Sequence, residues 1–266
     1  MRITLLQTDI VWLDTTANMR HAAQLMDAAP GSDLYVLPEM WATGFCTDPD
    51  AAWPDETAVL AWMKRQAAAR GCAVAGTVAV RVEGEAAHGA MRDATRDVNL
   101  RRNRFCFVRP DGSIDCYDKR NIFVCGGENR AFAPGTERVI AEWRGVRFML
   151  QVCFDLRFPE TARNVMPAPY DVLLYAANWP ASRRTAWDAL LPARAVENQA
   201  FVVGVNRTGT DRPSAADAIV YDGGSAAYDA CGRCLARLDA RPQAVTVDID
   251  VEALHRFRTG FPVLRS

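Results

Sequence analysis

The sequence predicts an α/β protein of four layers, an αββα sandwich in which two mixed β-sheets face each other and helices cover their outer sides. Three observations predict this class. Short apolar segments alternate with amphipathic ones, as in βα units. Two pairs of apolar segments are joined by the turn sequences Pro110-Asp111-Gly112 and Ala230-Cys231-Gly232, which indicate hairpins. Two mixed sheets accommodate parallel βα units and antiparallel hairpins in one fold.

Strands are expected where short runs are rich in Val, Ile, Leu and aromatic residues. In chain order these runs are 3–8, 34–38, 72–82, 98–108, 114–117, 147–153, 172–177, 201–206, 225–228, 234–238 and 244–249. Apolar residues at helical spacing predict helices over 16–29, 55–70, 159–163, 185–199 and 251–257. Gly71 is a C-terminal stop for the second helix. Pro192 removes a backbone donor inside the fourth segment, so we expect a helix start or a kink there.

Composition indicates one large domain over residues 1–266, because 50% of the residues are hydrophobic and no linker-like segment interrupts the pattern. The net charge of −1, with 31 basic residues scattered among 32 acidic ones, indicates neither a nucleic-acid partner nor a polybasic membrane patch. The N-terminal segment has neither a signal-peptide core nor the length of a membrane span, so we expect a cytoplasmic protein with reduced cysteines and no disulfides.

Three polar residues stand at the ends of predicted strands. Cys153 ends an apolar run that begins GVRFML, Glu39 follows DLYVLP, and Lys119 follows SIDCYD. Open α/β sheets keep their ligand crevices at the carboxyl ends of strands, so a thiol, a carboxylate and an ammonium can share one site. The carboxylate would accept the thiol proton. The ammonium would lower the thiol pKa and stabilise the charge that develops on a substrate carbonyl oxygen.

Histidine is the usual partner of a catalytic thiol, but the chain contains only three. His21 and His255 fall in predicted helices and His88 in a Gly/Ala-rich stretch, and none is next to a predicted strand end. A cysteine–histidine dyad is therefore disfavoured. The pair Cys231 and Cys234 resembles half of a zinc or redox site, but no second pair of ligands accompanies it. We expect neither a metal nor an organic cofactor.

The segments LPEMWATGF, YDKRNIF and QVCFDLRFPE, around Glu39, Lys119 and Cys153, resemble in matching order the three motif blocks of the nitrilase, or carbon–nitrogen hydrolase, superfamily. GGENRAFAPG, YAANWPASR and ARAVENQAFVVGVNRTG are similar to its supporting blocks, so the resemblance covers almost the whole chain. It implies the nitrilase-like αββα fold. It also implies hydrolysis of amides, nitriles or carbamoyl groups through a cysteine thioester, without a cofactor.

The resemblance assigns a role to each motif residue. Glu39 is implied to be the base, Lys119 the stabiliser of the oxyanion and Cys153 the nucleophile. Glu128 corresponds to the second glutamate of the family, which orients the lysine or the substrate. The backbone N–H of Phe154 is implied to complete the oxyanion hole.

Within the superfamily, EMWATGF, DKRNIF, CFDLRFP and NWPASR are most similar to the omega-amidase branch. That branch hydrolyses the terminal amide of 2-oxoglutaramate and 2-oxosuccinamate. Such substrates carry a remote carboxylate, so we expect a cation in the pocket, with Arg183, Arg184 and Arg207 as candidates. Trp179 and Phe123 are expected to form apolar walls. The small Cys-Gly-Gly segment at 125–127 predicts a wider pocket.

Several alternatives share this triad. One is another amidase of the superfamily, acting on deaminated glutathione or on N-carbamoyl compounds. A second is a thiol acyltransferase, which would pass the thioester to an amine. A non-enzymatic binding module would fit only an incomplete triad. The resemblance further implies a homodimer. Arg157 and Glu160 are expected to form an ion pair that fixes the loop after the nucleophile.

Overall fold

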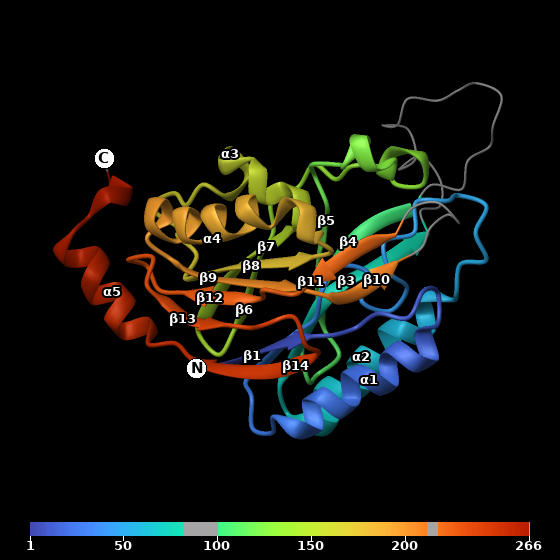
Figure 1. Cartoon of the computed structure of the whole chain (residues 1–266). Helices are drawn as coiled ribbons and strands as arrows, with labels where there is room; N and C mark the ends of the chain where they lie inside the picture. Colours follow the sequence, from blue (N-terminus) through green and yellow to red (C-terminus); the bar gives the residue numbers. More distant parts are fainter. Residues whose placement is uncertain (82–100, 212–217, 266) are drawn as a thin grey trace.

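Two six-stranded mixed sheets pack face to face in the computed structural model, which describes residues 1–81, 101–211 and 218–265 (Figure 1). The first sheet contains, in order, β14 (Gln243–Asp248), β1 (Arg2–Gln7), β2 (Leu34–Val36), β3 (Ala73–Arg81), β4 (Arg101–Val108) and β5 (Ile114–Asp118). The second contains β13 (Cys234–Arg237), β12 (Ala226–Tyr228), β9 (Phe201–Asn206), β8 (Val172–Ala177), β7 (Val146–Val152) and β6 (Ile140–Trp143). A separate ribbon pairs β10 (Thr208–Asp211) with β11 (Ile219–Asp222).

Parallel pairs lie in the middle of each sheet and antiparallel pairs lie toward its edges. β1, β2 and β3 are parallel, as are β7, β8 and β9. Both predicted hairpins are confirmed, because β5 is antiparallel to β4 and β13 is antiparallel to β12. The turn residues Gly112 and Gly232 have φ values of +84° and +78°, a region that glycine enters without steric cost.

Helices cover both outer faces and confirm the predicted four layers. They are α1 (Thr15–Ala28), α2 (Glu56–Arg70), α3 (Pro159–Ala162), α4 (Arg184–Asn198) and α5 (Val251–Gly260). The first two lie along the first sheet, and α3 and α4 lie along the second, while α5 extends to one end (Figure 1). The expected stop of α2 is confirmed at Gly71, which adopts a φ of +62°. No helix within the described ranges is long and apolar enough to cross a bilayer.

The expected helix start at Pro192 is wrong, because α4 continues through it from Arg184 to Asn198. Proline removes only one backbone hydrogen bond, and tertiary packing holds the helix on both sides of it. Trp187, Leu191 and Ala195 are completely buried against the second sheet. Packing of this kind contributes most of the stability of a helix in a protein, so it overrides the local preference.

The main core fills the space between the two sheets. The Phe107 ring on β4 lies 5.2 Å from the Phe148 ring on β7, so the two inner faces meet through aromatic contact. A second core lies between the first sheet and its helices, where Trp41 packs on Trp62 of α2 with ring centroids 5.0 Å apart. These cores fix the strand ends that carry the polar site.

Three strands are not predicted by the sequence: β6, β10 and β11. They have four residues each, and several of those residues are only partly buried, so they lack a clear apolar run. Parts of two predicted strands, at 82 and 98–100, lie outside the described residues, and so does His88.

Candidate active site

Polar residues from three strand ends meet where the two sheets face each other. Glu39 lies in the segment after β2, Lys119 directly follows β5, and Cys153 directly follows β7. The first two strands belong to one sheet and β7 to the other. Only 0%, 1% and 9% of these residues, respectively, is exposed. The fold thus gathers the three motif residues in one buried place.

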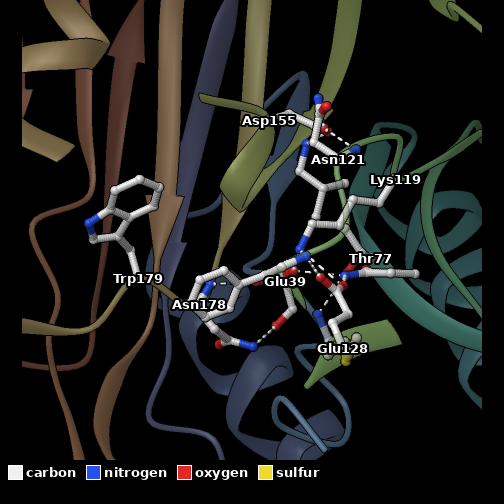
Figure 2. A network of polar contacts seen from close by, with 12 residues as sticks. Glu39, Thr77, Lys119, Asn121, Glu128, Asp155, Asn178 and Trp179 are labelled. Atoms are coloured by element: carbon white, nitrogen blue, oxygen red, sulfur yellow. Dashed lines mark hydrogen bonds and ion pairs between the residues drawn. The ribbon is translucent and has the colours of Figure 1, made fainter. Parts of the chain in front are cut away.

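Lys119 is held between two carboxylates. Its Nζ donates a hydrogen bond of 2.9 Å to Glu39 Oε1 and bonds of 3.0 and 2.8 Å to the two carboxylate oxygens of Glu128 (Figure 2). Glu128 also accepts a 2.7 Å bond from the backbone N–H of Phe123. Its position therefore suits orienting the lysine, one of the two roles that the resemblance implied.

Two asparagines that the motifs did not single out complete this network. The Nδ2 of Asn103, on β4, donates to Glu39 at 2.7 Å and to Glu128 at 3.0 Å. The backbone N–H of Asn178, just after β8, donates to Glu39 Oε2 at 2.9 Å, and its side-chain amide donates to the Glu39 carbonyl at 2.9 Å (Figure 2). One signal existed for Asn103, because the alternation of RRNRFCFV places it on the same buried face as Phe105.

Cys153 occupies a strained turn between β7 and a 3₁₀ turn, η4 (Cys153–Arg157), with a φ of +44°. A residue other than glycine in this region costs about 1–3 kcal/mol and persists only when its surroundings fix it. Asp155 supplies that support. Its buried carboxylate accepts bonds from the Val152 N–H at 2.9 Å and from the Tyr117 hydroxyl at 2.8 Å. It also accepts two bonds from Asn121, at 2.9 and 2.8 Å.

The electrostatics of the site favour a neutral thiol beside a carboxylate. Burial raises the pKa of Cys153 well above its ordinary value, Glu39 raises it further, and Lys119 only partly opposes this. The expected lowering of the thiol pKa by Lys119 is therefore confirmed in direction, but desolvation and Glu39 together outweigh it. Burial lowers the pKa of Lys119, but Glu128 and Glu39 outweigh it and keep the lysine charged. Burial raises the pKa of Glu128 against the opposing effect of the lysine.

A cavity of about 190 Å³ opens onto the sulfur. Its lining residues are Phe45, Thr47, Lys119, Phe123, Gly126, Arg130, Cys153, Phe154, Arg157, Asn178, Trp179, Pro180, Arg183, Ile219 and Tyr221. Among the described residues, this lining contains four cationic side chains and no Asp or Glu. The cavity therefore suits a small molecule that carries negative charge.

Several expected substrate residues do line this cavity. Arg183 lies over the Phe123 ring at 4.8 Å, and the Trp179 indole N–H donates to the Arg183 carbonyl at 2.8 Å. The Phe154 ring packs on Phe123 with centroids 5.0 Å apart. Gly126 is also in the wall. A Cβ on Gly126 would overlap the Phe123 ring, so the small loop accommodates this ring rather than simply widening the space.

Two expected carboxylate-binding arginines lie elsewhere. Arg207 is completely buried, donates to Asp211 at 2.7 Å, and lies 4.5 Å from the Tyr221 ring centroid. Arg184 forms an ion pair of 2.8 Å with Asp188. Because a buried guanidinium needs a compensating charge, Arg207 is committed to the protein. It stabilises Tyr221 from behind the cavity instead of facing a ligand.

Arg157 replaces them as a cavity residue. The expected ion pair with Glu160 is not formed; the Arg157 guanidinium instead lies 5.2 Å from the Trp179 ring centroid, in the cavity wall. The sequence placed Arg157 directly after the nucleophile turn. This position in the sequence is compatible both with an ion pair to Glu160 and with a place in the cavity wall.

A buried thiol, its carboxylate and an ammonium, set between the two sheets of an αββα sandwich, define a thiol hydrolase, and no histidine lies among the described residues that line its cavity. The family model described as carbon-nitrogen hydrolase matches residues 2–259. The chain belongs to the carbon–nitrogen hydrolase family and is a hydrolase acting on carbon–nitrogen bonds of amides.

Relatives that align with nearly the whole chain are amidases by name. The chain is 39% identical to "Omega-amidase YafV" of Yersinia enterocolitica, covering 98% of this chain and 94% of the relative. It is 30% identical to "2-oxoglutaramate amidase" of Bacillus subtilis, covering 98% and 95%. The crystal structure of XC1258 from Xanthomonas campestris, a CN-hydrolase superfamily protein with an arsenic adduct in its active site, is 36% identical. It superposes with a TM-score of 0.84 over 100% of this chain and 96% of that one.

Proposed function

We propose that the protein is an omega-amidase, which hydrolyses the terminal amide of small 2-oxo dicarboxylic acid monoamides such as 2-oxoglutaramate and 2-oxosuccinamate. One observation carries the proposal: the small cavity above Cys153 is lined by Arg130, Arg157 and Arg183, and none of the three forms an ion pair with a described acid. The fourth cation of the lining, Lys119, is already paired with Glu39 and Glu128. A neutral amide would gain nothing from the charge of the three arginines, whereas an amide with a remote carboxylate would. The names of the relatives agree with this substrate class.

In the first half of the reaction, Sγ of Cys153 attacks the amide carbonyl carbon while Glu39 takes the thiol proton. The carbonyl oxygen becomes an oxyanion beside Lys119 Nζ. The backbone N–H of Phe154 is its second donor, since it lies in the first turn of η4, where N–H groups have no partner within the helix. The carbon–nitrogen bond then breaks, ammonia leaves with the proton from Glu39, and the acyl group stays on sulfur.

In the second half, a water molecule gives a proton to Glu39 and attacks the thioester carbonyl. The carbon–sulfur bond breaks, Cys153 recovers its proton from Glu39, and the dicarboxylic acid leaves. The same oxyanion donors serve both halves.

The remote carboxylate is assigned to Arg183 and Arg157. Both are exposed at the cavity, and neither forms an ion pair with a described acid. Both guanidinium groups lie over aromatic rings, Phe123 and Trp179, which hold them in place.

Ammonia release from 2-oxoglutaramate, deaminated glutathione and an N-carbamoyl amino acid, measured in parallel, tests the substrate assignment. We expect the first to have the highest kcat/KM. Arg183→Ala should raise KM for 2-oxoglutaramate about 10- to 100-fold, as for a lost hydrogen-bonded charge. Arg184→Ala is the matched control and should leave KM unchanged, because Arg184 pairs with Asp188. Preference for another substrate, or equal effects of the two variants, would contradict the assignment.

A thiol acyltransferase remains the second candidate, because a thioester on Cys153 can also react with an amine. Product analysis with an added amine separates the two. We expect the free acid as the main product.

We also propose that the protein is a homodimer that pairs through the outer face of its second sheet. Val165, Met166 and Val196 are 48%, 41% and 52% exposed near the ends of α3 and α4. Asn164 beside them bonds to Asn198 at the end of α4, so these apolar side chains share one region. Val196→Asp should shift the molar mass in light scattering from dimer to monomer. An unchanged mass would exclude this face.

A further inference from the structure

Two cysteines face each other across the β4–β5 hairpin, outside the active site. Cys106 and Cys116 are register partners in this antiparallel pair. The hairpin is closed by a 2.9 Å bond from the Arg109 N–H to the Ser113 carbonyl. At its other end, the Lys119 N–H donates at 2.9 Å to the Asn103 carbonyl.

The alternation of hydrogen-bonded pairs fixes the geometry of the two cysteines. The pairs Arg109/Ser113 and Asn103/Lys119 are hydrogen-bonded, and each lies an odd number of residues from the cysteines. Because bonded and non-bonded pairs alternate, Cys106 and Cys116 form a non-hydrogen-bonded pair. At such positions the Cα atoms are about 4.5 Å apart and the side chains approach most closely. This separation lies within the roughly 4.4–6.8 Å range that a disulfide requires. A bond between the two sulfurs therefore needs no change of register.

The two thiols differ in accessibility. Cys106 is 1% exposed and packs in the core between the first sheet and its helices. Cys116 is exposed on β5, the edge strand of that sheet. An oxidant can therefore reach Cys116, while Cys106 stays protected beside it.

The surroundings of Cys116 favour its thiolate. The neighbouring Cys106 thiol lowers the pKa of Cys116 to about 7, and the Arg104 guanidinium contributes in the same direction against partial burial. Cys116 and burial act in the opposite direction on Cys106 and raise its pKa well above the ordinary value. Near neutral pH the pair thus contains an exposed nucleophile and a buried protonated thiol.

We propose that Cys106 and Cys116 are a redox-active dithiol that closes to a reversible disulfide when the protein meets a peroxide. The Cys116 thiolate attacks one peroxide oxygen, the O–O bond breaks, and hydroxide leaves, giving a sulfenic acid on Cys116. The Cys106 sulfur then attacks the sulfenic sulfur, and the S–O bond breaks. Its thiol proton and the departing hydroxyl leave as water. Overall, two thiols lose two electrons and two protons, and the peroxide is reduced to water.

The disulfide would connect the two strands that deliver site residues. Asn103 lies three residues before Cys106, and Lys119 lies three residues after Cys116. Because the strands are already in this register, we expect the oxidised hairpin to keep the active-site geometry and to resist separation of β4 from β5. This site is independent of the proposed amidase function.

Peptide mapping of the full-length Cys153→Ala variant tests the dithiol without interference from the nucleophile. The protein is treated with hydrogen peroxide and unfolded in urea so that buried thiols become accessible. Its remaining thiols are then alkylated, and it is cut between the two cysteines for mass spectrometry. We expect a linked Cys106–Cys116 peptide pair with a mass lower by two hydrogens. Dithiothreitol should remove the link. Its rate of formation should rise as the pH increases through about 7, where Cys116 ionises.

Two matched variants in that background complete the test. Cys116→Ser changes an exposed side chain and should abolish the linked pair. Cys231→Ser changes another exposed cysteine and should leave it unaffected. The proposal is overturned if Cys106 and Cys116 both remain open to alkylation after peroxide treatment. It is also overturned if Cys116 accumulates as sulfinic acid with no link to Cys106.

Discussion

Glu39 has two effects on Cys153 that act at different stages. In the resting site its charge raises the pKa of the thiol, and in the proposed mechanism it takes the thiol proton during attack. Lys119 and Asn103 bind the same carboxylate oxygen of Glu39, at 2.9 and 2.7 Å. They fix this carboxylate in one orientation, which suits the proposed role of Glu39 as the base.

Glu39→Gln separates these two effects. Removing the carboxylate charge removes a contribution that raises the pKa of Cys153, so this pKa should fall. Alkylation of Cys153 by iodoacetamide should then reach its half-maximal rate at a lower pH than in the unchanged protein. Ammonia release should fall by about 10²–10⁴-fold, because the base is lost. Arg184→Ala should alter neither measurement. A midpoint of alkylation that stays or moves to higher pH would show that Glu39 does not control the thiol.

At the residue scale, motif order predicted which side chains would be near one another, because each motif block carries its own recognisable neighbours. Asn103 was missed and Arg157 was given the wrong role, for one physical reason. Asparagine and arginine occur in many environments, and their roles here depend on contacts between strands or turns far apart in sequence. The misassigned Arg207 shows the same limit, since only the structure reveals Asp211 beside it.

Among the elements, the turn η4 determines where the nucleophile points. It links the end of β7 to the end of β5 through one buried carboxylate, that of Asp155, which receives bonds from both sides. The strained φ of Cys153 is thereby maintained by contacts that also position the segment containing Lys119. The two strand ends should respond together when this link is weakened.

Asp155→Asn tests that coupling. Asparagine has the shape of aspartate, but an NH₂ group replaces one of its two acceptor oxygens. That group would point at the hydrogen-bond donors of Tyr117, Val152 or Asn121, which would lose their acceptor. We expect the free energy of unfolding to fall by about 1–3 kcal/mol, measured by urea denaturation, because a buried donor loses its partner. We also expect kcat to fall more than KM changes. Asp111→Asn, in an exposed turn, is the control and should change little. A stable variant with full activity would refute the role of Asp155.

For the helices and strands, the sequence predictions were correct where turn or cap residues mark the end of an element. Turn chemistry predicted both hairpins, and Gly71 marked the end of α2. The predictions were wrong or incomplete where tertiary packing, rather than local sequence, determines the secondary structure. α4 crosses Pro192 because its apolar face is buried, and the short strands β6, β10 and β11 owe their conformation to pairing partners rather than to their own composition.

The whole molecule is held together by the core between the two sheets, and the active site lies at one end of that core. Glu39 and Lys119 come from one sheet and Cys153 from the other. Any change in the separation of the sheets therefore changes the distance between base and nucleophile. Stability of the sandwich and catalytic geometry should be linked.

Phe148→Ala tests this link, because Phe148 is completely buried and contacts Phe107 across the sheets. The cavity should lower the free energy of unfolding by about 3–5 kcal/mol. Urea denaturation measures this loss, and ammonia release on the folded variant should also decrease. Phe261→Ala removes a ring that is 59% exposed and serves as the control, with a much smaller loss. Equal losses in the two variants would contradict the inter-sheet core.

For the whole molecule, the alternation of segments and the hairpins predicted the layers, since burial patterns depend on which face of each element is apolar. The order of strands within each sheet was not predictable in this way, because several orders bury the same faces. The strand order decides which strand ends of the two sheets face each other. The distance between Cys153 and the residues from the other sheet depends on it.

The most direct test of the account is to trap the covalent intermediate. Enzyme and 2-oxoglutaramate are mixed, quenched with acid within one turnover, digested and examined by mass spectrometry. The proposed mechanism predicts an acyl thioester on the peptide that contains Cys153, and no adduct and no ammonia release with Cys153→Ala. Ammonia release by Cys153→Ala at the unchanged rate, or an acyl group on a different residue, would contradict it.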